Sequence, residues 1–206
     1  MAKVAGGELA AAVSRAGGLG ILGGGYGDAE WIATEVAAAG TARVGIGVIT
    51  WNMADGGLRS ILSHSPCAVW LAFGDLAPYI SPIHESGANV ICQVGTVAEA
   101  EEAVAAGADV IVAQGTEAGG HGRPQQSLHK TLADISDALP EVALVAAGGM
   151  NDQADLDAAR HFGAAGVALG TAFYATHEAI DTDGAKQRLT EIEGDETVRS
   201  LSLIHI

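Results

Sequence analysis

A histidine lies in a glycine-rich loop near the middle of the chain. The segment Gly119-Gly120-His121-Gly122 comes shortly after the apolar run 110–113. In α/β proteins, the loop that follows a buried strand commonly carries reactive groups. Glycines let the backbone come close to a flat or anionic ligand, and an imidazole can accept or donate a proton near neutral pH. The pattern therefore predicts a ligand site beside His121; the alternative is a surface turn with an incidental histidine.

Two later turns have the residue types of a phosphate site. Gly148-Gly149 and Leu169-Gly170-Thr171 each follow a short apolar run. The loops after the last two strands of a barrel frequently supply backbone N–H groups to a phosphate. Gly148 and Gly149 allow close backbone approach. Gly170 and Thr171 add amide donors and a hydroxyl near the start of a helix, where the helix dipole favours an anion.

Polar side chains also end two neighbouring strands. Gln114 ends the strand before the histidine loop, so its amide can hydrogen-bond a heteroaromatic ring at the barrel mouth. Gln93 ends the preceding strand and is placed to do the same; for either glutamine the alternative is a buried amide satisfied within the protein. Glu117 has no visible charge partner and is predicted to be a solvated loop residue. Trp51 follows a strand end and is a candidate wall of the substrate pocket.

A repeating unit positions these loops: an alanine-rich amphipathic segment, a break containing glycine, and a short apolar strand. Continuous apolar runs of this length indicate strands covered on both faces. Asp28, Thr96 and Asp152 stand where helix N-caps are expected. The predicted strands are residues 19–22, 44–49, 68–73, 89–94, 110–113, 143–147 and 166–169.

The alternation of strands and helices fits either a doubly wound sheet or a (β/α)8 TIM barrel, and the even repeat favours the barrel. Residues 10–16 already read as the first helix, so we expect the first strand to precede residue 1. The expected fold is therefore α/β, an incomplete TIM barrel with strands 2–8, in one domain over residues 1–200. Its open seam between strands 2 and 8 would leave backbone groups unpaired.

Composition excludes several other classes. The formal charge is −15 with only 10 Lys and Arg in 206 residues, which argues against nucleic-acid and anionic-membrane partners. No apolar run approaches the ~20 residues needed to span a bilayer. Cys67 and Cys92 form no CxxC pair, and no His or carboxylate cluster has metal-site spacing. These features predict a cytoplasmic protein with free thiols and no metal.

The segments 114–122, 146–150 and 170–171 together closely resemble the nitronate monooxygenase family, formerly called 2-nitropropane dioxygenases. Residues 10–20 are also similar to that family's first helix and second strand, and the resemblance extends from residue 4 to about residue 180. It implies an FMN-dependent enzyme that oxidises alkyl nitronates with O2 to a carbonyl compound and nitrite.

The resemblance also implies roles for single residues. His121 matches the catalytic histidine of the family, and the flavin ring is expected near Gln114 and Gly119. The cofactor-binding set implied by the resemblance and by the glycine turns is Gln114, Gly119, Gly148, Gly149, Leu169, Gly170 and Thr171. The resemblance further implies a small nitronate as the substrate, and the oligomeric state is not determined by these motifs.

Two departures from the family pattern limit what the resemblance implies: one flavin contact differs, and the family's first strand and the C-terminal segments that help close its substrate site are not recognised in this sequence. Many members have an asparagine that touches the flavin where this chain has Val48-Ile49-Thr50-Trp51. The Gly-Gly-His motif is shared with NAD(P)H-dependent flavin enoyl-acyl-carrier-protein reductases on the same barrel, and an inactive FMN-binding fragment is a third alternative. Residues 201–206 resemble a translated transposon end from sequencing libraries and are expected to be an artefactual tail, with the chain a fragment at both ends.

Overall fold

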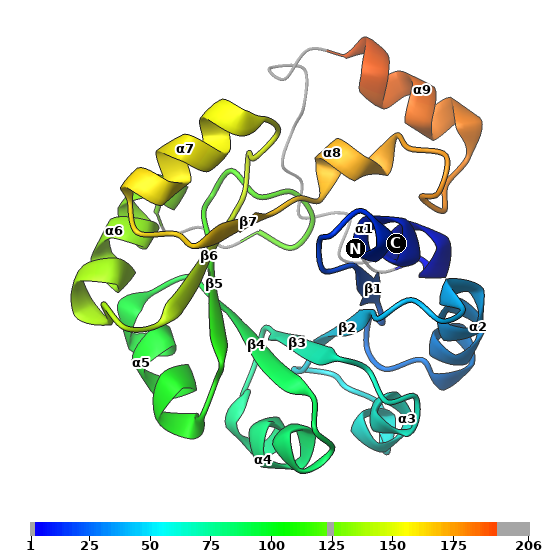
Figure 1. Cartoon of the computed structure of the whole chain (residues 1–206), viewed down its shortest axis with the longest axis horizontal. Helices are drawn as coiled ribbons and strands as arrows, with labels where there is room; N and C mark the ends of the chain where they lie inside the picture. Colours follow the sequence, from blue (N-terminus) through cyan, green and yellow to red (C-terminus); the bar gives the residue numbers. More distant parts are fainter. Residues whose placement is uncertain (1–2, 123–125, 193–206) are drawn as a thin grey trace.

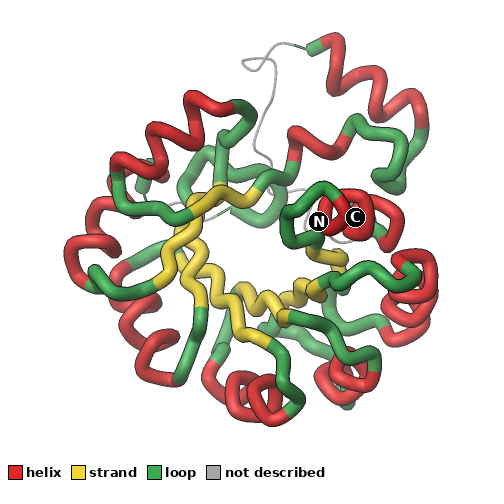
Figure 2. Tube along the Cα trace, in the orientation of Figure 1, coloured by secondary structure: helices red, strands yellow, loops and turns green. Residues whose placement is uncertain are grey.

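Seven parallel strands form one curled sheet whose spatial order follows the sequence, β1-β2-β3-β4-β5-β6-β7. The computed structural model describes residues 3–122 and 126–192, so the predicted tail 201–206 lies outside the described residues. Figure 1 and Figure 2 show the strands surrounding a central axis, with helices on the outside. This arrangement confirms the predicted incomplete TIM barrel. The strands labelled β1–β7 in the structure are the predicted strands 2–8.

The strands are β1 (Ile21–Gly23), β2 (Gly45–Ile49), β3 (Ala68–Ala72), β4 (Asn89–Val94), β5 (Val110–Gln114), β6 (Ala143–Ala147) and β7 (Gly166–Ala168). The helices are α1 (Gly7–Arg15), α2 (Ala29–Ala39), α3 (Gly57–Ser63), α4 (Ala77–Glu85), α5 (Val97–Ala106), α6 (Leu128–Ala138), α7 (Gln153–His161), α8 (Thr171–Tyr174) and α9 (Asp183–Glu191).

Three predicted N-caps are confirmed. The side chains of Asp28, Thr96 and Asp152 each accept a hydrogen bond from the backbone N–H three residues later, at the starts of α2, α5 and α7. Such bonds satisfy N–H groups that the helix itself leaves unpaired. They fix where each helix begins, and so where the preceding strand-end loop must stop.

The first helix begins at Gly7, earlier than the predicted residue 10, and this glycine lets the helix pack closely on α2. A Cβ on Gly7 would lie 1.9 Å from the backbone oxygen of Glu35 on α2, so α1 and α2 touch at this point. Gly20 likewise allows close packing against α1, since a Cβ built on it would lie 1.8 Å from the Ala10 backbone oxygen. At the other edge of the sheet β7 ends at Ala168, so Leu169 belongs to the loop that follows.

Two apolar layers cover the sheet, one on each face. The larger layer lies between the strands and the helices and includes the fully buried Ile46, Leu71 and Ile111. The smaller layer gathers Ala68, Trp70, Ala72, Ile91 and Val112 inside the barrel. This alternation along each strand confirms that the strands are covered on both faces.

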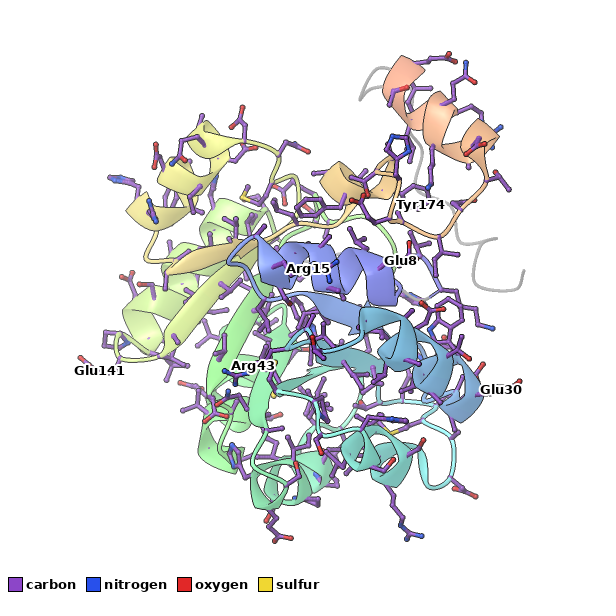
Figure 3. The ribbon with its side chains drawn as sticks, turned by 45° about the vertical axis from the view of Figure 1, so that its right-hand side comes forward. Glu8, Arg15, Glu30, Arg43, Glu141 and Tyr174 are labelled. Atoms are coloured by element: carbon purple, nitrogen blue, oxygen red, sulfur yellow. The ribbon has the colours of Figure 1, made fainter. Side chains whose placement is uncertain are left out.

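The open side of the barrel lies between β1 and β7, which pair on one edge only among the described residues. At the carboxyl end of the strands, residues just before α1 bridge part of this side. Gly23 N–H donates to the Ala5 oxygen at 2.8 Å, and Ile180 N–H donates to the Val4 oxygen at 2.9 Å. Figure 3 shows α1, labelled at Glu8 and Arg15, on the side of the barrel beneath the segment that carries Tyr174.

Candidate functional site

The loops after β5, β6 and β7 meet at the carboxyl end of the sheet. A Cβ on Gly148 would lie 2.8 Å from the Ala118 backbone nitrogen, and one on Gly119 would lie 3.3 Å from Thr171 Oγ1. Gly148 also has φ +127°, a conformation that side-chain-bearing residues rarely adopt. The structure therefore brings the predicted glycine turns and Thr171 together, and glycine is required where the first two loops touch.

Backbone donors are available on the two later loops. In the part of the chain that the structure describes, the N–H groups of Gly149 and Gly170 donate no hydrogen bond. Gly170 and Thr171 are exposed, and no atom lies within 4 Å of a Cβ built on Gly170. The helix that starts at Thr171 has only 4 residues, so single N–H groups, and not the helix dipole invoked from the sequence, are the relevant donors.

His121 lies among aromatic rings from two other strand-end loops. Its ring centroid is 5.5 Å from that of Trp51 and 5.6 Å from that of Phe73, and the latter two rings are 5.2 Å apart. Thr50, buried at the end of β2, donates its hydroxyl to the Phe73 oxygen at 2.6 Å. Phe73 has φ +59°. The histidine is thus held beside an aromatic wall that includes Trp51, the residue predicted to line a pocket.

Gln114 supports the histidine loop directly. Its Nε2 donates to the His121 backbone oxygen at 2.8 Å, and its Oε1 accepts from Gln93 Nε2 at 2.7 Å. Gln93 Oε1 accepts from the Trp70 indole N–H at 2.9 Å. Both glutamines are buried, and these contacts correspond to the alternative of amides satisfied within the protein.

Glu117 is exposed, as predicted, but it is not simply a solvated loop residue. Its Oε2 accepts from the Leu128 N–H at 2.9 Å, which satisfies a free donor at the start of α6. No charge partner could be found from the sequence, because the partner is the backbone N–H of Leu128 across the loop. Glu117 therefore ties the histidine loop to α6.

Two other histidines make contacts of their own away from these loops. His84 Nε2 lies 2.9 Å from Asp109 Oδ2, and His129 stacks on Phe162. No cluster of His, Cys, Asp or Glu in the described ranges could hold a metal ion. Burial raises the pKa of the Cys92 thiol to about 12, and the nearby Asp109 charge adds to this effect.

Two hollows open elsewhere on the molecule. One of about 600 Å³ lies beside α3 and α4 and includes Arg59 and Tyr79 in its lining. The other, of about 720 Å³, lies at the amino ends of the strands and includes Arg15 and Arg43. Neither reaches His121. No helix within residues 3–122 and 126–192 is long and apolar enough to cross a membrane.

Three contributors to the site were missed from the sequence: Thr50, Trp70 and Phe73. Phe73 carries a local signal, since an aromatic residue before Gly74 ends a predicted strand. Thr50 and Trp70 carry none, because their roles depend on partners more than 20 residues away.

The family model described as nitronate monooxygenase matches residues 42–201. A nitronate monooxygenase from Neurospora crassa is 35% identical over 97% of this chain and 65% of its own length. A protein from Mycobacterium tuberculosis named (3aS,4S,5R,7aS)-5-hydroxy-7a-methyl-1-oxo-octahydro-1H-indene-4-carboxyl-CoA dehydrogenase is 36% identical over 96% of this chain and 57% of its own.

Among solved structures, FabK from Thermotoga maritima superposes with a TM-score of 0.85 at 30% identity, covering 91% of this chain and 61% of that one. The chain thus spans 57–65% of the length of these three proteins.

Proposed function

Because the chain belongs to the nitronate monooxygenase family, we propose that it is the FMN-binding barrel, over residues 1–200, of an enzyme that oxidises alkyl nitronates. The substrates are a small nitronate and O2, and the products are a carbonyl compound and nitrite. The observation that carries the proposal is that the glycine-rich loop of His121 touches the loop after β6 and Thr171 after β7 at one end of the barrel. The two free cysteines support a cytoplasmic location.

The residues present fit the cofactor. The N–H groups of Gly149 and Gly170, which are free of partners in the described chain, suit a phosphate, and the hydroxyl of Thr171, the residue after Gly170, lies near Gly119. Gly148 removes the side chain that would push the neighbouring loop away, and Leu169 offers an exposed apolar surface. The ring would lie toward Gly119 and Gln114, whose Oε1 has a second lone pair for a donor.

FMN, when bound, supplies the electron acceptor between the nitronate and O2. The contribution of the chain is to position and to move protons. The His121 imidazole can take a proton from the carbon of a nitroalkane or hold the anionic nitro oxygens of a nitronate. Trp51 and Phe73 cover one side of that imidazole, so a substrate approaches it from the remaining side.

The test begins with the purified 206-residue chain, incubated with FMN, desalted and examined by visible absorption. We expect a retained flavin band and, on adding an alkyl nitronate and O2, the appearance of nitrite. The His121→Asn variant should keep the flavin and lose most of the turnover. If turnover is unchanged in His121→Asn, the histidine takes no part in the reaction. If a soluble chain loses all of its flavin on desalting, the proposal that this chain is an FMN-binding barrel is wrong.

A second function remains as an outcome of the same experiment. The Gly-Gly-His motif and the similarity to FabK give weaker support to an NAD(P)H-dependent flavin enoyl-acyl-carrier-protein reductase. In that case NAD(P)H would bleach the bound flavin without any nitronate, and nitrite would not form. A flavin that responds to neither compound would identify a barrel that binds FMN without catalysis.

A further inference from the structure

A line of three buried polar side chains crosses the inside of the barrel and ends at the histidine loop. The Trp70 indole N–H donates to Gln93, Gln93 donates to Gln114, and Gln114 donates to the His121 backbone oxygen, at 2.9, 2.7 and 2.8 Å. Trp70, Gln93 and Gln114 are 9%, 9% and 4% exposed. Buried polar groups lose their water on folding, so breaking any one bond would leave a donor or acceptor unsatisfied.

Strand register places the three side chains on one diagonal. Gln93 pairs with Ala72 on β3 and with Val112 on β5. Trp70 lies two residues before Ala72, and Gln114 lies two residues after Val112, so all three side chains point to the inner face. Gly47 is the partner of Trp70 on β2, which leaves room on the inner face beside the indole.

The two ends of this line determine its direction. An indole N–H can only donate and a backbone carbonyl can only accept, whereas each glutamine amide offers both functions. Gln93 must therefore present its oxygen to Trp70 and its NH2 to Gln114. Gln114 in turn must present its oxygen to Gln93 and its NH2 to the His121 carbonyl. A flip of either amide would set two like groups against each other.

We propose that Trp70 and Gln93 are positioning residues for His121, acting through Gln114 by a hydrogen-bond relay of one fixed direction. The relay holds the His121 backbone from inside the barrel, while Trp51 and Phe73 hold its ring from the mouth. The catalytic use of His121 in this proposal rests on the proposed function. The ordering of the histidine loop by the relay does not depend on that function.

The decisive variant is Gln93→Glu, with Gln93→Met as a control of similar shape that can neither donate nor accept strongly. An ionised carboxylate can only accept, so Gln114 would have to turn its NH2 toward Glu and its oxygen toward the His121 carbonyl. A neutral carboxyl group accepts and donates as glutamine does. The glutamate variant should therefore lose the relay at high pH and regain it at low pH.

The readout is hydrogen exchange of the backbone amides of residues 118–122, measured without FMN and always relative to the original chain at the same pH. Burial at this position raises the pKa of a carboxyl group, so the carboxyl group in Gln93→Glu should be neutral at pH 5 and ionised at pH 8. We expect protection in Gln93→Glu to fall about tenfold at pH 8 and to recover at pH 5, whereas Gln93→Met falls about tenfold at both. Equal protection in all three proteins would overturn the relay. Equal losses in both variants at both pH values would overturn the fixed direction of the relay, because the neutral carboxyl group, which accepts and donates as glutamine does, would then fail to restore it.

A measurement on the unchanged chain keeps the proposal testable if a variant fails to fold. The side-chain NH2 protons of Gln114, followed by NMR, should exchange at least about tenfold more slowly than those of Gln153, which is exposed on α7. Equal rates would overturn the relay. If the relay is present but no nitronate is turned over, the proposed function fails and the positioning of the loop stands.

Discussion

The imidazole of His121 lies edge-on against the indole of Trp51, with ring centroids 5.5 Å apart and planes inclined by 67°. Edge-to-face pairs of this kind are favourable because the positive edge of one ring meets the negative face of the other. Trp51 is 54% exposed, so its removal takes little from the core. The Trp51 side chain can therefore be removed to test its contact with His121 with little effect on the stability of the barrel.

Truncation of Trp51 should weaken catalysis without unfolding the protein. We expect Trp51→Ala to lower nitronate turnover about three- to tenfold, since an aromatic pair contributes about 0.5–1.5 kcal/mol, with little change in Tm. Leu19→Ala is the control, because Leu19 is an exposed apolar residue at the amino end of the barrel. Equal turnover in the two variants would contradict a role for the Trp51 ring.

Gly148→Ala should weaken flavin binding more than it weakens the fold. The new methyl group would clash with the Ala118 backbone at 2.8 Å and push the histidine loop away from the loop that holds Gly149, one of the proposed phosphate donors. Gly87→Ala is the matched control: Gly87 also has a positive φ, +84°, but no atom lies within 4 Å of its Cβ position.

Both variants should lose about 1–2 kcal/mol of unfolding free energy from left-handed strain, measured by urea titration. Only Gly148→Ala should raise the FMN dissociation constant, by about tenfold or more. The same FMN affinity in both variants would argue against close approach of these loops as a requirement for the site.

Glu35 on α2 should contribute to stability through α1. It is 8% exposed, and its Oε2 accepts the Gly7 N–H at 2.8 Å. Glu35→Ala leaves that buried donor unpaired, at an expected cost of about 1–3 kcal/mol in the free energy of unfolding. The control is Glu101→Ala, which makes the same substitution at an exposed position of α5. Urea titrations that coincide for the two variants would contradict the assignment.

Asp109 should make the stability of the barrel depend on pH in the acidic range. Burial acts to raise the pKa of its carboxyl, but the hydrogen bonds from the Val90 N–H and from His84, together with the His84 charge, outweigh this and lower the pKa. A lowered pKa in the folded state means that the unfolded chain binds more protons, so the stabilisation is complete above about pH 4 and is lost as the pH falls through the folded pKa.

Urea titrations between pH 3 and pH 7 test this expectation. The stability difference between the original chain and Asp109→Asn should be largest near neutral pH and should shrink on acidification. Asp137→Asn, on the exposed surface of α6, controls for the loss of one negative charge. A difference for Asp109→Asn that does not change with pH would contradict the lowered pKa.

Local sequence signals were sufficient for the framework of the barrel. The seven strands and the N-caps Asp28, Thr96 and Asp152 could be predicted because each depends on residues within a few positions of one another. Element ends were less accurate where packing decided them. α1 starts at Gly7, which packs closely on α2, whereas the sequence predicts the helix over residues 10–16.

The sequence by itself determined the alternation of strands and helices, and with it the set of loops that must gather at one end, because apolar runs and glycine turns act over short distances. Only the tertiary structure decided what surrounds His121. The register of β3, β4 and β5 brings Trp70, Gln93 and Gln114 into one line, and the ends of β2 and β3 bring Trp51 and Phe73 to the imidazole. A shift of one residue in any of these strands would turn the side chains to the opposite face, and no local pattern in the chain encodes that register.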